Sequence, residues 1–256
     1  MQDMKIDLGL KIPLMNASGI LGFAPEANNR INFARLGAFI THPVSLLPRM
    51  PAHGTRFGAY HGGFLLHTGY PNPGLRAVTR RYQDAWQRSP LPVWVHLLGD
   101  EPEDVKKMVL FLEELPGVVG FELGIPPEID ARLARSLVQA ALGELPLIVS
   151  IPLERVIDLA EMIGKQFPQV ILSLGPPRGK LPCSDKSMVA GRLYGPAIFP
   201  QALLVLERVL SLDIPVIAAG GVYSVEQARL MLKAGAVAVQ LDAVLWRNGL
   251  QNWILE

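Results

Sequence analysis

Eight short apolar runs alternate with helix-length segments along this chain, and this alternation constrains its fold more than any other feature. The runs are rich in valine, isoleucine, leucine and alanine, as expected for parallel strands that are buried on both faces. They are Pro13–Ser18, Ala38–Thr41, Pro92–Leu97, Val118–Leu123, Pro146–Ile151, Val170–Leu174, Pro215–Ala218 and Ala236–Gln240. Eight strands that alternate with helices in a chain of 256 residues predict an α/β fold, a closed (β/α)8 TIM barrel.

Segments with apolar residues at helical spacing lie between most of these runs. They are Asp104–Leu115, Ile129–Leu142, Leu153–Phe167, Pro200–Leu212 and Val225–Lys233. Asp100 and Glu103 have the spacing of a capping box, which predicts the start of the first of these helices. An open doubly wound sheet is the alternative, but Ala17–Gly19 is a poor match to the glycine-rich turn of that fold. We expect one barrel domain over residues 1–256.

Two segments interrupt the alternation. Residues 44–74 are rich in proline, glycine and histidine, and Phe57–Leu66 within them is predicted to form a hairpin around His61. Residues 175–195 are predicted to be a loop after the sixth strand. Both segments follow the carboxyl end of a strand, so we expect them at the face of the barrel that carries function.

Composition excludes several classes of function. The formal net charge is +1, so no electrostatic feature favours nucleic acid or an anionic membrane surface. Cys183 is the only cysteine, which excludes an internal disulfide and a multi-cysteine metal site within this chain. Neither a signal peptide nor an apolar run long enough to span a membrane is recognised, so a cytoplasmic protein is expected.

A pair of glycines, Gly220 and Gly221, ends the seventh run and precedes a helix that starts near Ser224. Glycines allow backbone N–H groups to approach an anion closely, and the amino end of a helix carries a positive partial charge. In (β/α)8 barrels the loops after strands seven and eight form the usual phosphate site. The pattern predicts a phosphate-bearing cofactor or substrate there. A tight turn that binds nothing is the alternative.

Several motifs, taken in order, resemble the dihydroorotate dehydrogenase family, in particular its cytosolic class 1 flavoproteins. Leu10–Gly19 is similar to the family's opening L-x-N-P-x-x-x-A-S-G, His67–Gly74 to N-S-x-G-L-x-N-P-G, and Gly191–Ala197 to G-G-L-S-G-P-A. The resemblance extends from about residue 8 to residue 243. It implies a barrel that binds FMN and oxidises dihydroorotate in pyrimidine biosynthesis.

The resemblance also implies roles for individual residues. The expected FMN contacts are Ala17, Ser18, Gly19, Thr41, Gly195, Gly220 and Gly221. His42 replaces a lysine after the second strand, and His67 replaces an asparagine that orients the substrate. Because histidine titrates near neutral pH, His42 and His67 are the expected catalytic residues. His96, on the third strand, is a further candidate to face the barrel mouth, and no metal site is expected from the histidine spacing.

Other positions depart from the family's pattern. Gly124–Pro127 stands where the family carries its base in N-x-S-C-P-N, and neither a thiol nor a hydroxyl remains there. Ser150 replaces the lysine that stabilises the reduced flavin. Asp242 replaces a glycine next to the expected phosphate. Directed inward it would repel an anion, whereas directed outward or paired with Arg247 it would leave the site attractive.

The sequence therefore predicts an FMN-dependent oxidoreductase resembling dihydroorotate dehydrogenase, with weak or altered activity toward a small-molecule substrate. One alternative is a barrel without catalysis that serves as a binding or partner subunit. Another is a phosphate-binding barrel enzyme that uses His42 and His67 without a flavin. A homodimer is the assembly considered.

Overall fold

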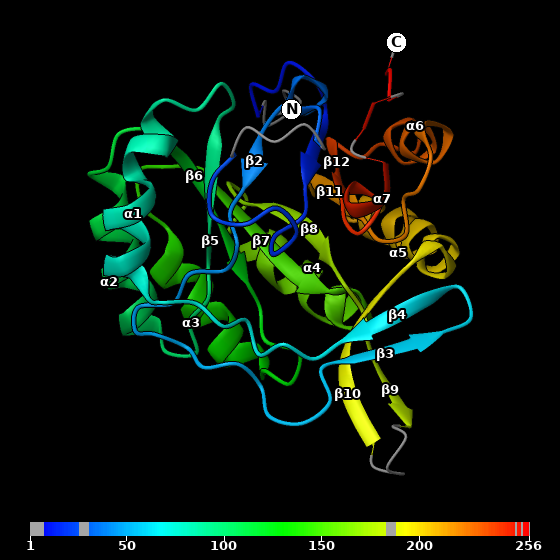
Figure 1. The fold of residues 1–256 in the computed structure, drawn as a ribbon, viewed down its shortest axis with the longest axis horizontal. Helices are drawn as coiled ribbons and strands as arrows, with labels where there is room; N and C mark the ends of the chain where they lie inside the picture. Colours follow the sequence, from blue (N-terminus) through cyan, green and yellow to red (C-terminus); the bar gives the residue numbers. More distant parts are fainter. Residues whose placement is uncertain (1–7, 26–30, 183–187, 249, 252, 256) are drawn as a thin grey trace.

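The fold is known from a computed structural model that describes residues 8–25, 31–182, 188–248, 250–251 and 253–255. Cys183 lies outside the described residues. Eight parallel strands form the predicted barrel, in the order β1-β12-β11-β8-β7-β6-β5-β2 (Figure 1). A parallel bridge between Met15 and Ala38 joins β1 to β2 and so completes the circle. The strands are β1 (Leu14–Asn16), β2 (Phe39–Ile40), β5 (Val93–Leu97), β6 (Val118–Gly124), β7 (Leu147–Pro152), β8 (Ile171–Gly175), β11 (Val216–Ala219) and β12 (Ala238–Leu241).

Helices cover the outside of the barrel (Figure 1), and the five predicted helical segments are confirmed within about three residues at either end. Leu153–Arg155 is a short 3₁₀ turn that leads directly into the fourth helix. The predicted segment Leu153–Phe167 therefore consists of a 3₁₀ turn followed by an α-helix. The helices are α1 (Leu75–Gln87), α2 (Pro102–Glu113), α3 (Ala131–Ala141), α4 (Val156–Gln166), α5 (Phe199–Leu210), α6 (Val225–Ala234) and α7 (Leu245–Asn248). Among the described residues, no helix combines the length and the apolar character needed to cross a membrane.

The capping box predicted at Asp100 and Glu103 is wrong. Helix α2 begins at Pro102 with Glu101 at its N-cap, and no side chain caps it. Proline suits the first helical position because its missing N–H would have no partner there, so less capping is needed. The Asp100 carboxylate instead lies 3.4 Å from the Arg49 guanidinium.

A second sheet rises beside the barrel mouth, at the lower right of Figure 1. Its strands β3 (Phe57–Tyr60) and β4 (Gly63–Leu66) confirm the predicted hairpin. Residues 175–195, predicted to be a loop, instead form β9 (Arg178–Pro182) and β10 (Met188–Tyr194) on either side of a gap in the described chain. Because β10 pairs with β4 far away in sequence, giving the order β3-β4-β10-β9, no local pattern indicated these strands.

The interior of the barrel changes from apolar to polar along its axis. An apolar cluster fills one part of it, with Trp94 as its largest member and Met15, Ala38, Ile40, Ile148, Ile171, Ile217 and Ala238 around it. Glu122, Ser173 and Gln240 are buried polar residues on strands that bound the same interior. Burial of charge is costly unless it is paired and hydrogen-bonded, so this polar layer marks a functional candidate.

Candidate active site at the barrel mouth

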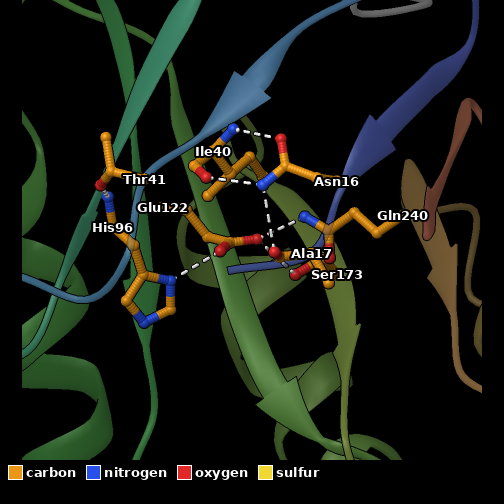
Figure 2. Close-up of polar contacts among 8 residues, drawn as sticks. All are labelled: Asn16, Ala17, Ile40, Thr41, His96, Glu122, Ser173 and Gln240. Atoms are coloured by element: carbon orange, nitrogen blue, oxygen red, sulfur yellow. Dashed lines mark hydrogen bonds and ion pairs between the residues drawn. The ribbon is translucent and has the colours of Figure 1, made fainter. Parts of the chain in front are cut away.

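Glu122 is the centre of the buried polar layer (Figure 2). Its Oε2 lies 2.6 Å from Nδ1 of His96, which occupies the paired position on the neighbouring strand β5. Its Oε1 accepts hydrogen bonds from the Gln240 amide at 2.5 Å and from the Ser173 hydroxyl at 3.3 Å. Both oxygens of the Glu122 carboxylate therefore have hydrogen-bonding partners. The four residues come from strands β5, β6, β8 and β12 and form one network below the mouth.

Backbone contacts hold the His96 side of this layer in place. The Thr41 hydroxyl oxygen accepts a hydrogen bond from the His96 N–H at 3.0 Å. The Asn16 side chain bonds both the N–H and the carbonyl of Ile40, at 3.0 and 2.6 Å. Thr41, an expected FMN contact, thus has its side chain inside the strand network, where it positions His96 (Figure 2).

A pocket opens above this layer, and we call it the mouth pocket. Its cavity volume is about 270 Å³. Residues from the barrel strand ends, from β9 and β10 and from the segment after β4 meet there, among them His67, His96, Gly124, Ser150, Arg178 and Arg192. The positions that lack the family's base and lysine, Gly124 and Ser150, therefore face the same pocket as three arginines and two histidines.

Arg192 and Tyr70 form a stack that divides the mouth. The Arg192 guanidinium carbon lies 3.6 Å from the Tyr70 ring centroid, and Arg192 also donates to the Tyr194 hydroxyl and the Thr68 hydroxyl. Burial raises the pKa of Tyr70 and of Tyr194, so both phenols stay neutral. Among the described residues, no carboxylate lies within ion-pair distance of Arg192, which is only 8% exposed. A buried cation without a counter-ion suits an anionic ligand.

Sequence patterns did not point to Glu122, Tyr70 or Arg192. A signal for Arg192 was present, because the motif G-G-L-S-G-P-A has glycine where this chain has Arg192. Glu122 lies in a strand and Tyr70 in a loop, and no motif marks either residue as functional. Their contributions become visible only through contacts with residues from other strands, His96 for Glu122 and Arg192 for Tyr70.

The two predicted catalytic histidines lie on different sides of this stack. His67 lines the mouth pocket. His42 lines a separate cavity with Gly19, where its Nε2 lies 3.3 Å from the Pro71 carbonyl oxygen, and burial lowers its pKa. Tyr70 and Arg192 border both cavities. The structure therefore does not join His42 and His67 in one catalytic unit.

The remaining expected cofactor contacts gather around a narrow inner cavity. Ala17, Ser18 and Gly220 line it together with Asp242 and Gln240. The Ser18 hydroxyl is buried and has no hydrogen-bond partner, so a polar ligand atom would satisfy it. Gly221 and Gly195 lie close to the start of α5 and to the β3–β4 hairpin, where an added Cβ would meet backbone atoms at 2.4 Å.

Asp242 turns inward, the less favourable of the two predicted orientations. Its Oδ2 lies 3.5 Å from the Gly221 nitrogen, and the amides of Ala243 and Val244 also point at the carboxylate. Burial raises the pKa of Asp242 to about 6, although the hydrogen bonds from these amides stabilise the ionised carboxylate and act to lower it. Its Oδ1 is buried without a partner. The carboxylate thus occupies the Gly221 amide, one of the two amides that were predicted to receive a phosphate.

The amino end of α6 is also engaged by its own residues. Ser224 and Gln227 form a capping box, in which the Gln227 amide oxygen accepts from the N–H groups of Tyr223 and Ser224 at 2.7 and 3.2 Å. The Ser224 hydroxyl accepts from the Gln227 N–H at 3.2 Å. The helix therefore contributes its dipole to the nearby site, while these three N–H groups already have partners.

Comparison with known proteins agrees with this architecture. Residues 3–127 match the family model of dihydroorotate dehydrogenase. The chain is 28% identical to dihydroorotate dehydrogenase A (fumarate) of Limosilactobacillus reuteri, over 95% of this chain and 86% of that protein. It is also 28% identical to the catalytic subunit of dihydroorotate dehydrogenase B (NAD(+)) of Trichlorobacter lovleyi, over 99% and 94% of the two chains.

Solved structures show the same fold. A ligand-free dihydroorotate dehydrogenase from Eimeria tenella has a TM-score of 0.73 at 15% identity, covering 93% of this chain and 80% of that one. The ferulenol complex of the enzyme from the same organism has a TM-score of 0.72 at 16% identity, over 93% and 78%. The ordered motifs, the family match over residues 3–127 and the nearly full-length relatives together make the chain similar to dihydroorotate dehydrogenases along almost its whole length.

Proposed function

We propose that this chain is a dihydroorotate dehydrogenase-like oxidoreductase with altered activity, which uses FMN and acts on a small anionic substrate in the mouth pocket. The main support is its similarity to class A and class B dihydroorotate dehydrogenases over more than nine-tenths of its length. The arginines of the mouth pocket suit a carboxylate substrate. The resemblance to cytosolic class 1 enzymes extends the proposal to a cytoplasmic location, with a homodimer as the assembly.

The residues of the inner cavity suit FMN on one condition. Gly220 and the Ser18 hydroxyl, which is buried without a partner, line this cavity and offer small size and a polar atom to a phosphate-bearing group. The Asp242 carboxylate opposes that phosphate by like-charge repulsion when it is ionised. Because its pKa is raised to about 6, the carboxyl group can become neutral in mildly acidic solution and can then donate to a phosphate oxygen. The chemistry of this lining therefore suits a phosphate group when Asp242 is protonated.

When bound, FMN would supply the hydride acceptor for an oxidation. The chain's own residues would bind and orient the substrate, with His67 and Arg178 on the walls of the mouth pocket and Arg192 at its buried end. The usual base and lysine positions hold Gly124–Pro127 and Ser150, which can neither take a proton nor supply a positive charge. We therefore expect dihydroorotate oxidation to be absent or severely slowed, by roughly 10²–10³-fold for the lost charge and by a further 10²–10⁴-fold unless another residue takes the place of the lost base.

Two measurements test this proposal. The purified protein, incubated with FMN at pH 5.5 and freed of excess cofactor, should retain a flavin absorption spectrum. Dihydroorotate should then bleach that spectrum slowly under anaerobic conditions, and a dye acceptor should restore it. Turnover at the rate of an ordinary family member would contradict the predicted loss of activity, and a colourless protein would contradict the flavin assignment.

A second candidate function is an anion-binding barrel without flavin. Arg192 and Tyr194 favour it, since they bring large side chains to positions where the family motif has glycine and serine. Inward-facing Asp242 favours it as well, because it already engages the amides near the phosphate position. A colourless protein that still binds orotate would support this second function over the first.

A further inference from the structure

His96 and Glu122 have the geometry of a proton-transfer pair. The imidazole Nδ1 and the carboxylate Oε2 are 2.6 Å apart, and the two side chains are only 6% and 1% exposed. The carboxylate is fixed by Gln240 and Ser173, so it holds the ring in one orientation (Figure 2). A carboxylate at Nδ1 stabilises the imidazolium that forms when Nε2 takes up a proton.

The other ring nitrogen, Nε2, faces the mouth pocket. Both His96 and Gly124 line that pocket. A Cβ added at Gly124 would lie 2.6 Å from Nε2, so only glycine leaves room for the ring in this position. Among the described residues, none forms a hydrogen bond with Nε2. The asparagine of the family motif at position 124 would not fit beside this imidazole. The loss of that asparagine and the placement of His96 are therefore linked.

Positive charge lines the same pocket. Arg192 stacks on Tyr70, and the Tyr70 ring centroid is 6.5 Å from that of His96. Arg192 is buried and lacks a carboxylate partner among the described residues, and Arg178 lies on the adjacent strand β9. A carboxylate ligand between these arginines and Nε2 would neutralise the buried charge.

We propose that His96 is the catalytic base of the mouth pocket, with Glu122 as its positioning residue and Arg192 as the anchor of a carboxylate substrate. The inference rests on the proposed function for its choice of substrate, dihydroorotate. Nε2 removes a proton from the CH₂ group next to the ring carbonyl. The electron pair of the broken C–H bond moves to the carbonyl oxygen as an enolate. Return of a solvent proton to that carbon restores the substrate, so the step needs no oxidant.

Hydrogen–deuterium exchange tests this step with or without flavin. Dihydroorotate is incubated with the purified chain in D₂O, and proton NMR measures the loss of the CH₂ signal. We expect the wild-type protein to exceed buffer, and His96→Gln to lower the enzymatic rate by roughly 10²-fold or more. His53→Gln, which alters an exposed histidine outside the mouth pocket, is the matched control and should leave the rate unchanged.

Glu122→Gln separates a chemical role from a structural one. The groups that face His96 are Glu122, Tyr70 and, beyond the Tyr70 ring, Arg192 and His42. Loss of the negative partner destabilises the protonated imidazole, so the pH midpoint of exchange should move down while the rate falls. Circular dichroism and the unfolding temperature show whether each variant is folded. Arg192→Gln should weaken orotate binding, measured by calorimetry, by about tenfold or more.

The results of these experiments separate the role of His96 as a base from the flavin function. Exchange by a colourless protein supports the base and contradicts the flavin function. Exchange no faster than buffer, in a protein that binds flavin, overturns the base alone. Full exchange in a folded His96→Gln variant, or an unshifted midpoint in Glu122→Gln, also overturns it.

Discussion

At the scale of single residues, Asp242 determines how the mouth responds to pH. Its pKa is about 6 in the folded chain, against an ordinary value of 3.8 for an aspartate, because burial disfavours the ionised form. The folded state therefore binds this proton more tightly than the unfolded state. Asp242 lowers the free energy of unfolding as pH rises from about 4 to about 6 and keeps it low above that range.

Asp242→Asn should therefore stabilise the chain at pH 7–8. A difference of about two pKa units corresponds to at most about 3 kcal/mol. The gain should vanish near pH 4, where the carboxyl group is neutral in both states. Chemical unfolding at pH 4 and pH 8 measures it, with Asp213→Asn, another single carboxylate removed, as the control. Equal effects of Asp242→Asn at the two pH values would show that burial does not disfavour the ionised carboxylate.

Residues of this kind could be predicted only in part. The replacement of glycine by Asp242 was visible because a motif gave the expected residue, but its inward orientation depends on how β12 turns into α7. His96 was recognised as a candidate from its strand, whereas its partner Glu122 was not. The buried pair forms across two strands, and a single sequence does not show which side chains of neighbouring strands are in register.

At the scale of elements, α6 illustrates how local chemistry starts a helix. Ser224 and Gln227 satisfy each other's backbone N–H groups in a capping box. The same pattern was expected at Asp100 and Glu103, where Pro102 starts the helix instead. The periodic spacing of apolar residues was enough to predict that each of these helices exists. The way each helix begins instead depended on one or two residues at its end.

Ser224→Ala should lower the free energy of unfolding by about 1 kcal/mol, because the Gln227 N–H would lose its acceptor. Ser224→Asp should retain most of the stability. Ser136→Ala serves as the control, since its hydroxyl lies on an exposed part of α3 and bonds only the Arg132 carbonyl. Denaturant titration measures all three. A Ser224→Ala variant as stable as Ser136→Ala would show that the capping box does not stabilise α6.

In the second sheet, Gly191 of β10 packs closely against β4. A Cβ added at Gly191 would lie 2.4 Å from the Leu66 carbonyl oxygen, so Gly191→Ala should push β10 away from β4. We expect a loss of roughly 1–3 kcal/mol and, because Arg192 follows directly, weaker binding of orotate. Gly58→Ala, on the outer strand β3, is the milder control, since its added Cβ meets only a flexible Leu181 side chain at 3.2 Å. Equal orotate affinity in both variants would contradict the link between this sheet and the mouth pocket.

At the scale of the whole molecule, the barrel was predictable, whereas its mouth was predictable only as far as the β3–β4 hairpin. Alternating apolar runs and amphipathic segments are local patterns, so all eight strands were found within about two residues at either end. The sheet that walls the mouth comes from two insertions more than 100 residues apart, which pair only in the folded chain. The pocket's arginines and tyrosines lie on those insertions, and their roles therefore stayed hidden.

The most direct test of the central claim, that this mouth binds FMN, is a fluorescence titration of FMN with the wild-type chain at pH 5.5 and pH 8. We predict saturable binding at pH 5.5 that is roughly tenfold tighter than at pH 8, because protonation removes the charge of Asp242. Asp242→Asn should bind tightly at both values, with only the small pH effect of the phosphate itself. Failure of both proteins to bind FMN at either pH would contradict the claim.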